Sequence, residues 1–322
     1  MNEILKFHPI LKEKVWGGEK IKNVLNKFSV SRKIGESWEL SGLPENVSVV
    51  SEGKYKGQSL NQLISVYKEK LSGKQVYEKY GEQFPLLIKF IDADDDLSVQ
   101  VHPDDTVAQK IYGQNGKNEL WYILDSDENA ELILGLNKNL SREEFRKSIK
   151  RNTLTENLNR VKVKRGDIFF IPAGRIHAVK KGVLLAEIQQ ASDITYRIYD
   201  WNRKDLNGKY RDLHIDEACK VADLNVEKNY LTKYSDEQNT FIPCVSNQFF
   251  TVNLLKFDKE IHKDYYESDS FVVFICTKGN FRIKYSGKET SVSFGETVLL
   301  PAAIKNIKII PEQESELLEV FV

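Results

Sequence analysis

Four side chains in this sequence have the types and spacing of a metal site. Gln100 and His102 stand two residues apart in the run Ser98-Val-Gln-Val-His, whose valines favour a strand. Because successive strand side chains point to opposite faces, Gln100 and His102 share one face. Glu119 begins the next apolar run, so an antiparallel return of the chain would bring its carboxylate beside this pair.

The fourth donor is His177, which ends the run Gly166-Asp-Ile-Phe-Phe-Ile-Pro-Ala-Gly-Arg-Ile-His. This run predicts a strand over 168–171, a turn set by its Pro and Gly, and a new strand at His177. Mixed imidazole and oxygen donors suit zinc or another divalent first-row metal, whereas four cysteines would indicate a closed structural zinc. Each residue could instead be an ordinary polar residue of a β-rich protein. Only five histidines occur, and two of them lie in matching strand-turn contexts, which favours a metal site. We expect one metal ion per chain, with zinc as the first candidate.

The composition limits the classes of function. The 322 residues suffice for two domains, and 47 basic residues balance 47 acidic ones, which gives no indication of nucleic-acid or membrane binding. The three cysteines are widely spaced and form no CxxC pair, as expected in a reducing compartment. No signal peptide and no apolar run of roughly 20 residues is recognisable. We therefore expect a cytoplasmic protein without an obligatory protein partner.

Helical segments are predicted at two places in an otherwise extended chain. Ser59 and Gln62 form a capping-box pattern that predicts helical structure over 59–80. Ser141 and Glu144 repeat the pattern and predict a basic helical segment over 141–159, an insertion between the Glu119 strand and the Gly166 run. Residues 225–239 are charged and weakly patterned, so we expect a domain boundary near 235.

The run that ends at His177 resembles the second motif of the cupin superfamily, Gly, five residues, then Pro-x-Gly-x-x-His. The Gln-x-His pair followed by Glu119 resembles the first cupin motif, with Gln100 in place of the usual first histidine and with a longer loop. The resemblance implies double-stranded β-helix barrels of the jelly-roll kind, with the metal in the barrel mouth.

Near the C-terminus, residues 294–306 repeat the pattern of residues 165–177. Glycine aligns with glycine, acid with acid and proline with proline, while Asn306 falls where His177 stood. No Gln-x-His precedes this second run, so we expect it to lack a metal site. The expected fold is mainly β: two cupin-type jelly-roll barrels with a small helical insertion. Residues 1–235 would form the catalytic, metal-binding domain and residues 236–322 a C-terminal cupin-like domain.

Over most of its length the sequence also resembles class I mannose-6-phosphate isomerases (phosphomannose isomerases) in their shorter bacterial form. The resemblance is carried by Gly-Glu36-Ser-Trp, Leu-Ile-Lys89, Ser98-Val-Gln100-Val-His102-Pro, Lys117-Asn-Glu119, and the stretch from His177-Ala through Glu187 and Ser192-Asp193 to Arg197. It implies that Gln100, His102, Glu119 and His177 bind zinc. It also places the family's active-site lysine, glutamate, aspartate and arginine on Lys117, Glu187, Asp193 and Arg197.

The resemblance implies interconversion of mannose 6-phosphate and fructose 6-phosphate through a cis-enediol. A divalent cation with open coordination positions can stabilise the negative charge that develops on O1 and O2. A base must move a proton between C2 and C1, and the candidates are Asp193, Glu187 and Lys117. The longer class has a histidine where this chain reads Asn115-Gly-Lys117, so no catalytic role of that histidine applies here.

Binding of the substrate requires cations near its phosphate. Arg197 can hold phosphate bidentately and Lys89 can add a point charge, while Trp16 and Glu36 are weaker candidates for the pocket wall. Arg197 could equally form an ion pair with Asp200 or Glu187.

Two other functions are compatible with a cupin barrel. A metal-dependent oxygenase usually offers three histidines or two histidines and a carboxylate, so Gln100 is an unusual donor for it, and dependence on oxygen would identify it. A non-catalytic sugar-binding cupin would be expected to lose its ligands in both barrels, whereas only the C-terminal one has lost them.

Overall fold

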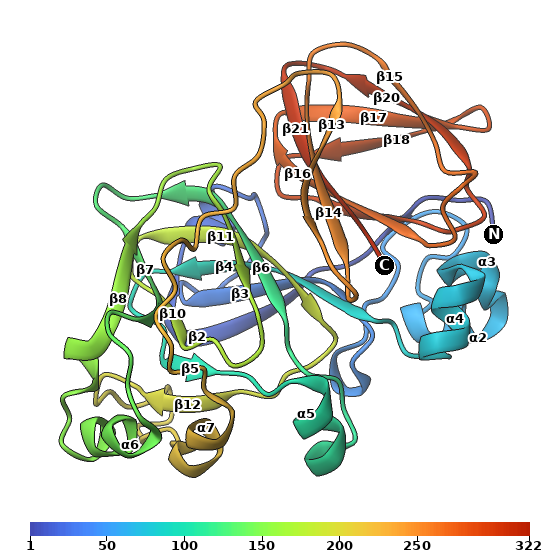
Figure 1. Cartoon of the computed structure of the whole chain (residues 1–322). Helices are drawn as coiled ribbons and strands as arrows, with labels where there is room; N and C mark the ends of the chain where they lie inside the picture. The colour runs from blue at the N-terminus through green and yellow to red at the C-terminus, as the bar shows by residue number, and fades with distance from the viewer. The chain divides into compact units, whose positions relative to one another are not determined.

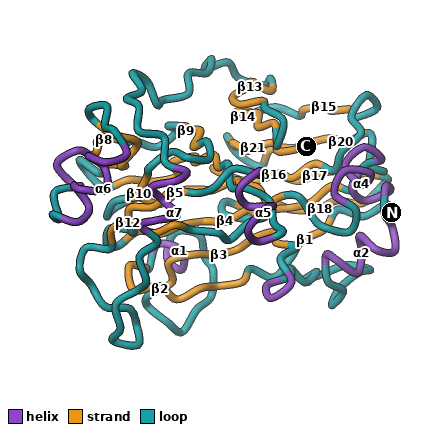
Figure 2. The backbone as a smooth tube through the Cα atoms, turned by 60° about the horizontal axis from the view of Figure 1, so that its bottom comes forward, coloured by secondary structure: helices purple, strands orange, loops and turns teal.

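The computed structural model describes all residues from Met1 to Val322 and is mainly β, with twenty-one strands, seven α-helices and two 3-10 helices (Figures 1 and 2). It contains two compact units, and both are discontinuous in sequence. Unit 1 comprises residues 1–10, 39–87 and 233–322, and unit 2 comprises residues 11–38 and 88–232. None of the helices combines the length and the apolar character that crossing a bilayer takes.

Unit 2 contains a jelly-roll barrel of the cupin type made from two sheets. The first sheet has the order β12-β5-β10-β7-β8 and the second the order β2-β3-β4-β11-β6-β9. The strands are β2 (Ile10–Gly18), β3 (Ile34–Ser41), β4 (Leu86–Ala93), β5 (Val99–Val101), β6 (Glu119–Ser126), β7 (Glu131–Leu136), β8 (Leu158–Lys162), β9 (Ile168–Ile171), β10 (His177–Val179), β11 (Val183–Gln190) and β12 (Tyr196–Tyr199). The helices are α1 (Lys20–Asn23), α5 (Asp105–Tyr112), α6 (Arg142–Lys150), η2 (Leu154–Asn157) and α7 (Ile215–Val221).

The outer face of the first sheet is covered by α6 and α7, and this packing decides which side chains face the barrel interior (Figure 1). Val99 and Val101 of β5 are fully buried in a cluster with Phe145 of α6 and Ala218 of α7. Since strand side chains alternate, Gln100 must point to the opposite face of β5. Burial of the valines therefore orients the pair that was predicted to bind metal.

Unit 1 is built around a second jelly-roll of the cupin type. Its sheets have the orders β1-β19-β16-β21-β14-β13 and β15-β20-β17-β18. The strands are β1 (Leu5–Lys6), β13 (Phe241–Ser246), β14 (Thr251–Phe257), β15 (Ile261–Asp264), β16 (Val272–Lys278), β17 (Asn280–Tyr285), β18 (Lys288–Ser293), β19 (Thr297–Leu300), β20 (Asn306–Pro311) and β21 (Ser315–Phe321). The helices are η1 (Pro44–Asn46), α2 (Leu60–Tyr67), α3 (Glu69–Ser72) and α4 (Lys74–Tyr80).

The two units repeat the strand-turn-strand pattern expected from the sequence. In unit 2, β9 ends at Ile171 and β10 begins at His177, and in unit 1, β19 ends at Leu300 and β20 begins at Asn306.

The interior of the second barrel holds the fully buried Glu319, whose carboxylate accepts hydrogen bonds from the Tyr265 hydroxyl (2.6 Å) and the Asn253 amide (2.7 Å).

One boundary between the units falls between residues 232 and 233, near the expected residue 235, but the first unit also contains two segments from the N-terminal part of the chain. Residues 1–10 and 39–87 belong to the same unit as the C-terminal strands because they hydrogen-bond to them. β1 pairs with β19, and the Leu71 and Ser72 carbonyls accept hydrogen bonds from the backbone N–H groups of Ala302 and Phe271.

Both predicted capping boxes are present, but the second helix is shorter than expected. Ser59 caps α2, and left-handed backbone at Lys68 and Gly73 divides the expected helical segment into α2, α3 and α4. Ser141 caps α6, which ends at Lys150 and not near residue 159. Asn152 has φ of 55°, which an α-helix cannot accommodate, and the remaining residues form η2 and the start of β8.

Candidate metal centre and active site

His102, Glu119 and His177 form a buried group inside the barrel of unit 2. Each side chain is at most 1% exposed, and their ligand atoms lie within 4.8 Å of one another. His102 directly follows β5, Glu119 opens β6 and His177 opens β10, which pairs with β5 so that His177 lies opposite Gln100. Three strand ends thus bring the predicted donors together.

Backbone carbonyls fix the tautomer of both histidines. His102 Nδ1 lies 2.8 Å from the Ile194 carbonyl and His177 Nδ1 lies 2.9 Å from the Arg175 carbonyl. Since a carbonyl oxygen only accepts, each Nδ1 carries the hydrogen and each neutral Nε2 offers an acceptor lone pair. That of His102 has no hydrogen-bond partner, whereas that of His177 accepts the Gln100 amide at 3.2 Å. These lone pairs face Glu119, at 3.3 Å for His102 and 3.6 Å for His177.

This donor set fits a divalent metal ion. His102 Nε2 and both carboxylate oxygens of Glu119 are buried without a hydrogen-bond partner, an arrangement that is unfavourable unless another group satisfies them. Imidazoles that donate Nδ1–H to carbonyls and offer Nε2 are typical of metal sites. Gln100, the fourth predicted donor, lies at the edge of this group, with its amide Nε2 3.2 Å from His177 Nε2.

The electrostatics of the group keep its donors ready for a cation. Burial, followed by the charge of the Lys117 ammonium, lowers the pKa of His102 to about 3, and burial also lowers the pKa of His177. Burial alone would raise the pKa of Glu119, but the positive charge of the neighbouring Lys117 ammonium opposes this, and the pKa is lowered. At neutral pH the site therefore offers two neutral imidazoles and a carboxylate. Lys117 Nζ lies 3.3 Å from the Glu119 carboxylate.

A row of alternating charges follows the strand order of the second sheet, from β2 through β3 and β4 to β11. Lys14 on β2 lies 3.0 Å from Glu36 on β3, and Lys89 on β4 lies 3.1 Å from Glu187 on β11. Lys89 and Glu187 are only 4% and 5% exposed, and the Lys89 ammonium lies over the Trp38 ring. The row thus links two predicted substrate-binding residues, Glu36 on β3 and Lys89 on β4, to one predicted base, Glu187, on the strand beside β6.

The same row shifts the pKa values of its members. Burial and the neighbouring Glu119 raise the pKa of Glu187, which places a carboxyl of reduced acidity near the buried group of His102, Glu119 and His177. Burial opposes ionisation of Lys89, but the carboxylates of Glu187 and Glu36 outweigh it and raise its pKa. Burial likewise opposes ionisation of Glu36, yet Lys89 and Lys14 lower its pKa to about 2.

Arg197 and Asp193 lie at the edge of this arrangement. Arg197 on β12 pairs with Gln100 on β5, so both side chains lie on the same face of the sheet. The Arg197 guanidinium donates to the Asp212 carbonyl at 3.0 Å, and Arg197 Nε is buried without a hydrogen-bond partner. Arg197 forms no ion pair with Asp200, because Arg203 and Arg211 bind that carboxylate. Asp193 is exposed, and its charge contributes to the raised pKa of Lys89.

Trp16, predicted as a pocket wall, is only 4% exposed and lies in the hydrophobic cluster that also contains Trp121. Sequence reasoning overlooked Trp121, whose indole N–H donates to Glu187 at 2.9 Å and whose ring packs edge-on against His177. The signal was available, because Trp121 follows Glu119 by two residues on the same strand and so shares its face.

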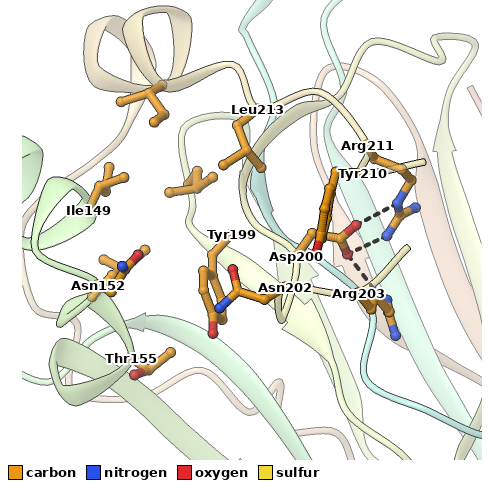
Figure 3. Close-up of a pocket in the computed structure, with 13 residues that line it drawn as sticks. Ile149, Asn152, Thr155, Tyr199, Asp200, Asn202, Arg203, Tyr210, Arg211 and Leu213 are labelled. Carbon is orange, nitrogen blue, oxygen red and sulfur yellow. Dashed lines mark hydrogen bonds and ion pairs between the residues drawn. The ribbon is translucent and has the colours of Figure 1, made fainter. Parts of the chain in front are cut away.

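A separate cavity of about 430 Å³ lies beside β12, among residues of α6, η2 and the 199–215 segment (Figure 3). None of the predicted site residues lines it. Asp200 binds the Arg211 guanidinium through two hydrogen bonds, of 2.7 and 2.5 Å, and also binds Arg203. These contacts already engage the charged groups in the cavity wall, so the cavity does not share the chemistry of the buried group.

The known proteins to which this chain is similar are mannose-6-phosphate isomerases, also called phosphomannose isomerases. The family model for the catalytic domain of type I phosphomannose isomerase matches residues 4–148. The chain is 34% identical over 307 residues to the mannose-6-phosphate isomerase of Streptococcus mutans, with 95% of both chains covered. It is 43% identical over 223 residues to the mannose-6-phosphate isomerase ManA of Bacillus subtilis, with 69% of both covered. The crystal structure of a Bacillus subtilis mannose 6-phosphate isomerase superposes with a TM-score of 0.90 at 32% identity over all of both chains.

Proposed function

Because the chain belongs to the type I mannose-6-phosphate isomerase family, we propose that it interconverts mannose 6-phosphate and fructose 6-phosphate. The buried group of His102, Glu119 and His177 carries this proposal, since three of its polar atoms have no hydrogen-bond partner. A buried acceptor left unpaired costs about 1–3 kcal/mol, and a bound cation would remove that cost. No comparable support exists for an oxygenase or for a non-catalytic sugar-binding cupin.

The ligands of the proposed ion, one zinc per chain, are His102, Glu119, His177 and Gln100. Gln100 would join through its amide oxygen, which requires the amide to turn so that oxygen and nitrogen exchange places. When bound, a divalent cation supplies Lewis-acid stabilisation of negative charge on the substrate oxygens O1 and O2.

The proposed reaction moves one proton between adjacent carbons. A base removes the proton from C2 of the aldose and returns it to C1, while the hydroxyl hydrogen of O2 is transferred to O1, so aldose and ketose differ in no atom. Glu187 fits this role, because its raised pKa increases its basicity and its contacts with Lys89 and Trp121 fix its position. Asp193 and Lys117 stay alternative candidates.

Cationic side chains would bind the phosphate of the substrate and line its pocket. Arg197 has an unpartnered guanidinium Nε on the same sheet face as Gln100, and it can hold a phosphate bidentately. Lys89, held by Glu187 and the Trp38 ring, would add a second positive charge to the pocket, and Glu36 and Trp16 would support its wall. We also propose that the enzyme works in the cytoplasm on a free sugar phosphate.

A coupled assay for fructose 6-phosphate formation from mannose 6-phosphate by zinc-loaded protein tests the activity. Repeating the reaction in D₂O tests the cis-enediol, because a base that exchanges its proton with solvent delivers deuterium to C1 of the product. We expect turnover with deuterium at C1. Absence of fructose 6-phosphate would refute the function, and turnover with complete retention of hydrogen would refute the enediol route alone.

A further inference from the structure

We propose that Asn118 and Gln190 form an amide clamp that positions the metal-binding residues. Both side chains are buried, at 6% and 4% exposure, and neither forms a hydrogen bond to His102 Nε2 or to the Glu119 carboxylate. Asn118 stands between Lys117 and Glu119, and Gln190 ends β11. They are therefore positioning residues, and they act through the segments to which they are bonded.

The inner part of the clamp joins the Glu119 strand to the turn before His177. Gln190 Oε1 accepts two hydrogen bonds from Asn118, from its backbone N–H at 3.1 Å and from its amide at 2.7 Å. Asn118 Oδ1 in turn accepts the backbone N–H of Ala173 at 2.9 Å. Turning either amide would place oxygen against oxygen, so hydrogen-bond chemistry fixes both orientations.

The outer part of the clamp reaches the segment that follows His102. Gln190 Nε2 donates to Asp105 Oδ1 at 2.9 Å, and the same oxygen accepts the backbone N–H of Gly116 at 2.7 Å. Asp105 lies three residues after His102, and Gly116 directly precedes Lys117. Through two buried amides and one carboxylate, the clamp thus joins the segments carrying His102, Lys117 with Glu119, and His177.

This connection matters because metal affinity depends on how closely the donors are held to the coordination geometry. Groups that orient metal ligands without touching the metal typically change metal affinity by about 10–100-fold when they are removed. The inference rests on the proposed metal site. The fold by itself does not need the clamp, since β6 and β11 are already joined by an uninterrupted ladder from Leu185 to Gln189.

Zinc affinity of the full-length protein, measured by competition with a chelating dye, tests the clamp. We expect Gln190→Met to weaken zinc binding by about 10–100-fold. Asn118→Ala should weaken it similarly, and the double variant should be no weaker than the worse single variant, because both changes break one network. Asp105→Ala, which alters an exposed side chain and so leaves the core intact, should weaken it by about threefold or more.

Asn157→Ala is the matched control for Asn118→Ala. Asn157 is another buried amide of unit 2, at the end of η2, and its Nδ2 donates to the Thr153 carbonyl, away from the segments that the clamp joins. Zinc affinity should stay within about threefold of the unmodified protein. Equal zinc affinity in Gln190→Met, Asp105→Ala and the unmodified protein would overturn the clamp, as would a loss in Asn157→Ala equal to that in Asn118→Ala. If the unmodified protein bound no zinc, the metal site and the clamp would both be wrong.

Discussion

Replacing Lys89 by methionine should strongly destabilise unit 2. The Lys89 ammonium and the Glu187 carboxylate lie 3.1 Å apart and are 4% and 5% exposed, so each is the main compensation for the buried charge of the other. Methionine keeps much of the side-chain volume and removes the charge. Glu187 would then retain the Trp121 N–H as its hydrogen-bond donor while still facing the negative charge of Glu119.

The size of the effect follows from leaving one charge buried alone. Breaking a buried ion pair by removing one partner costs about 3–5 kcal/mol. Without Lys89, Glu187 can lower this cost by binding a proton, so the loss should be largest near pH 8 and smaller near pH 5. The sign follows from linkage: a carboxyl whose folded-state pKa is raised contributes stability at low pH and loses it as pH rises. Adding Glu187→Gln should recover most of the loss.

Guanidinium unfolding followed by tryptophan fluorescence measures this directly. All four tryptophans, Trp16, Trp38, Trp121 and Trp201, belong to unit 2, so their emission reports on that unit. The reasoning would be refuted if Lys89→Met unfolded within 1 kcal/mol of the unmodified protein near pH 8, using about 1 kcal/mol as the scale of an ordinary exposed pair. It would also be refuted if the double variant were as unstable as Lys89→Met.

Four further variants test other parts of the structure. His102→Ala should lose both zinc and turnover, whereas Arg197→Ala should keep zinc and lose substrate affinity or kcat/KM; zinc content and steady-state kinetics decide this. Burial raises the pKa of Asp92 from 3.8 to about 6, so the unmodified protein loses stability as this carboxyl ionises with rising pH. Asp92→Asn should therefore gain stability relative to the unmodified protein between pH 4 and pH 7, by up to about 3 kcal/mol. A stability difference that does not vary with pH would contradict this. Tyr265→Phe should destabilise unit 1 by about 1–3 kcal/mol by removing a donor from buried Glu319, with zinc affinity unchanged, as calorimetry and dye competition would report.

The proximity of the donors was predictable because it depends on local rules. Strand alternation places Gln100 and His102 on one face, and a turn at Pro172 and Gly174 starts the next strand at His177. The antiparallel pairing of β10 with β5 then brings His177 opposite Gln100. The roles of the four donors as ligands stay a prediction.

Features that depend on strand order and long-range contacts were not predictable in the same way. Lys89 and Glu187 meet because β4 neighbours β11, and nothing in either segment specifies that neighbour. The same holds for Gln190, whose partners Asn118 and Asp105 are distant in sequence. The expected helix to residue 159 failed for a local reason, since basic composition and a good N-cap give no information about where a helix ends.

The most direct measurement of the central claim is the isomerase activity of one preparation before chelation, after chelation and after zinc is returned, with zinc content determined at each step. We predict that conversion of mannose 6-phosphate falls in proportion to bound zinc and returns when about one zinc ion per chain is restored, as expected for a single site of four donors. Undiminished conversion by protein that elemental analysis shows to be free of metal would contradict the account.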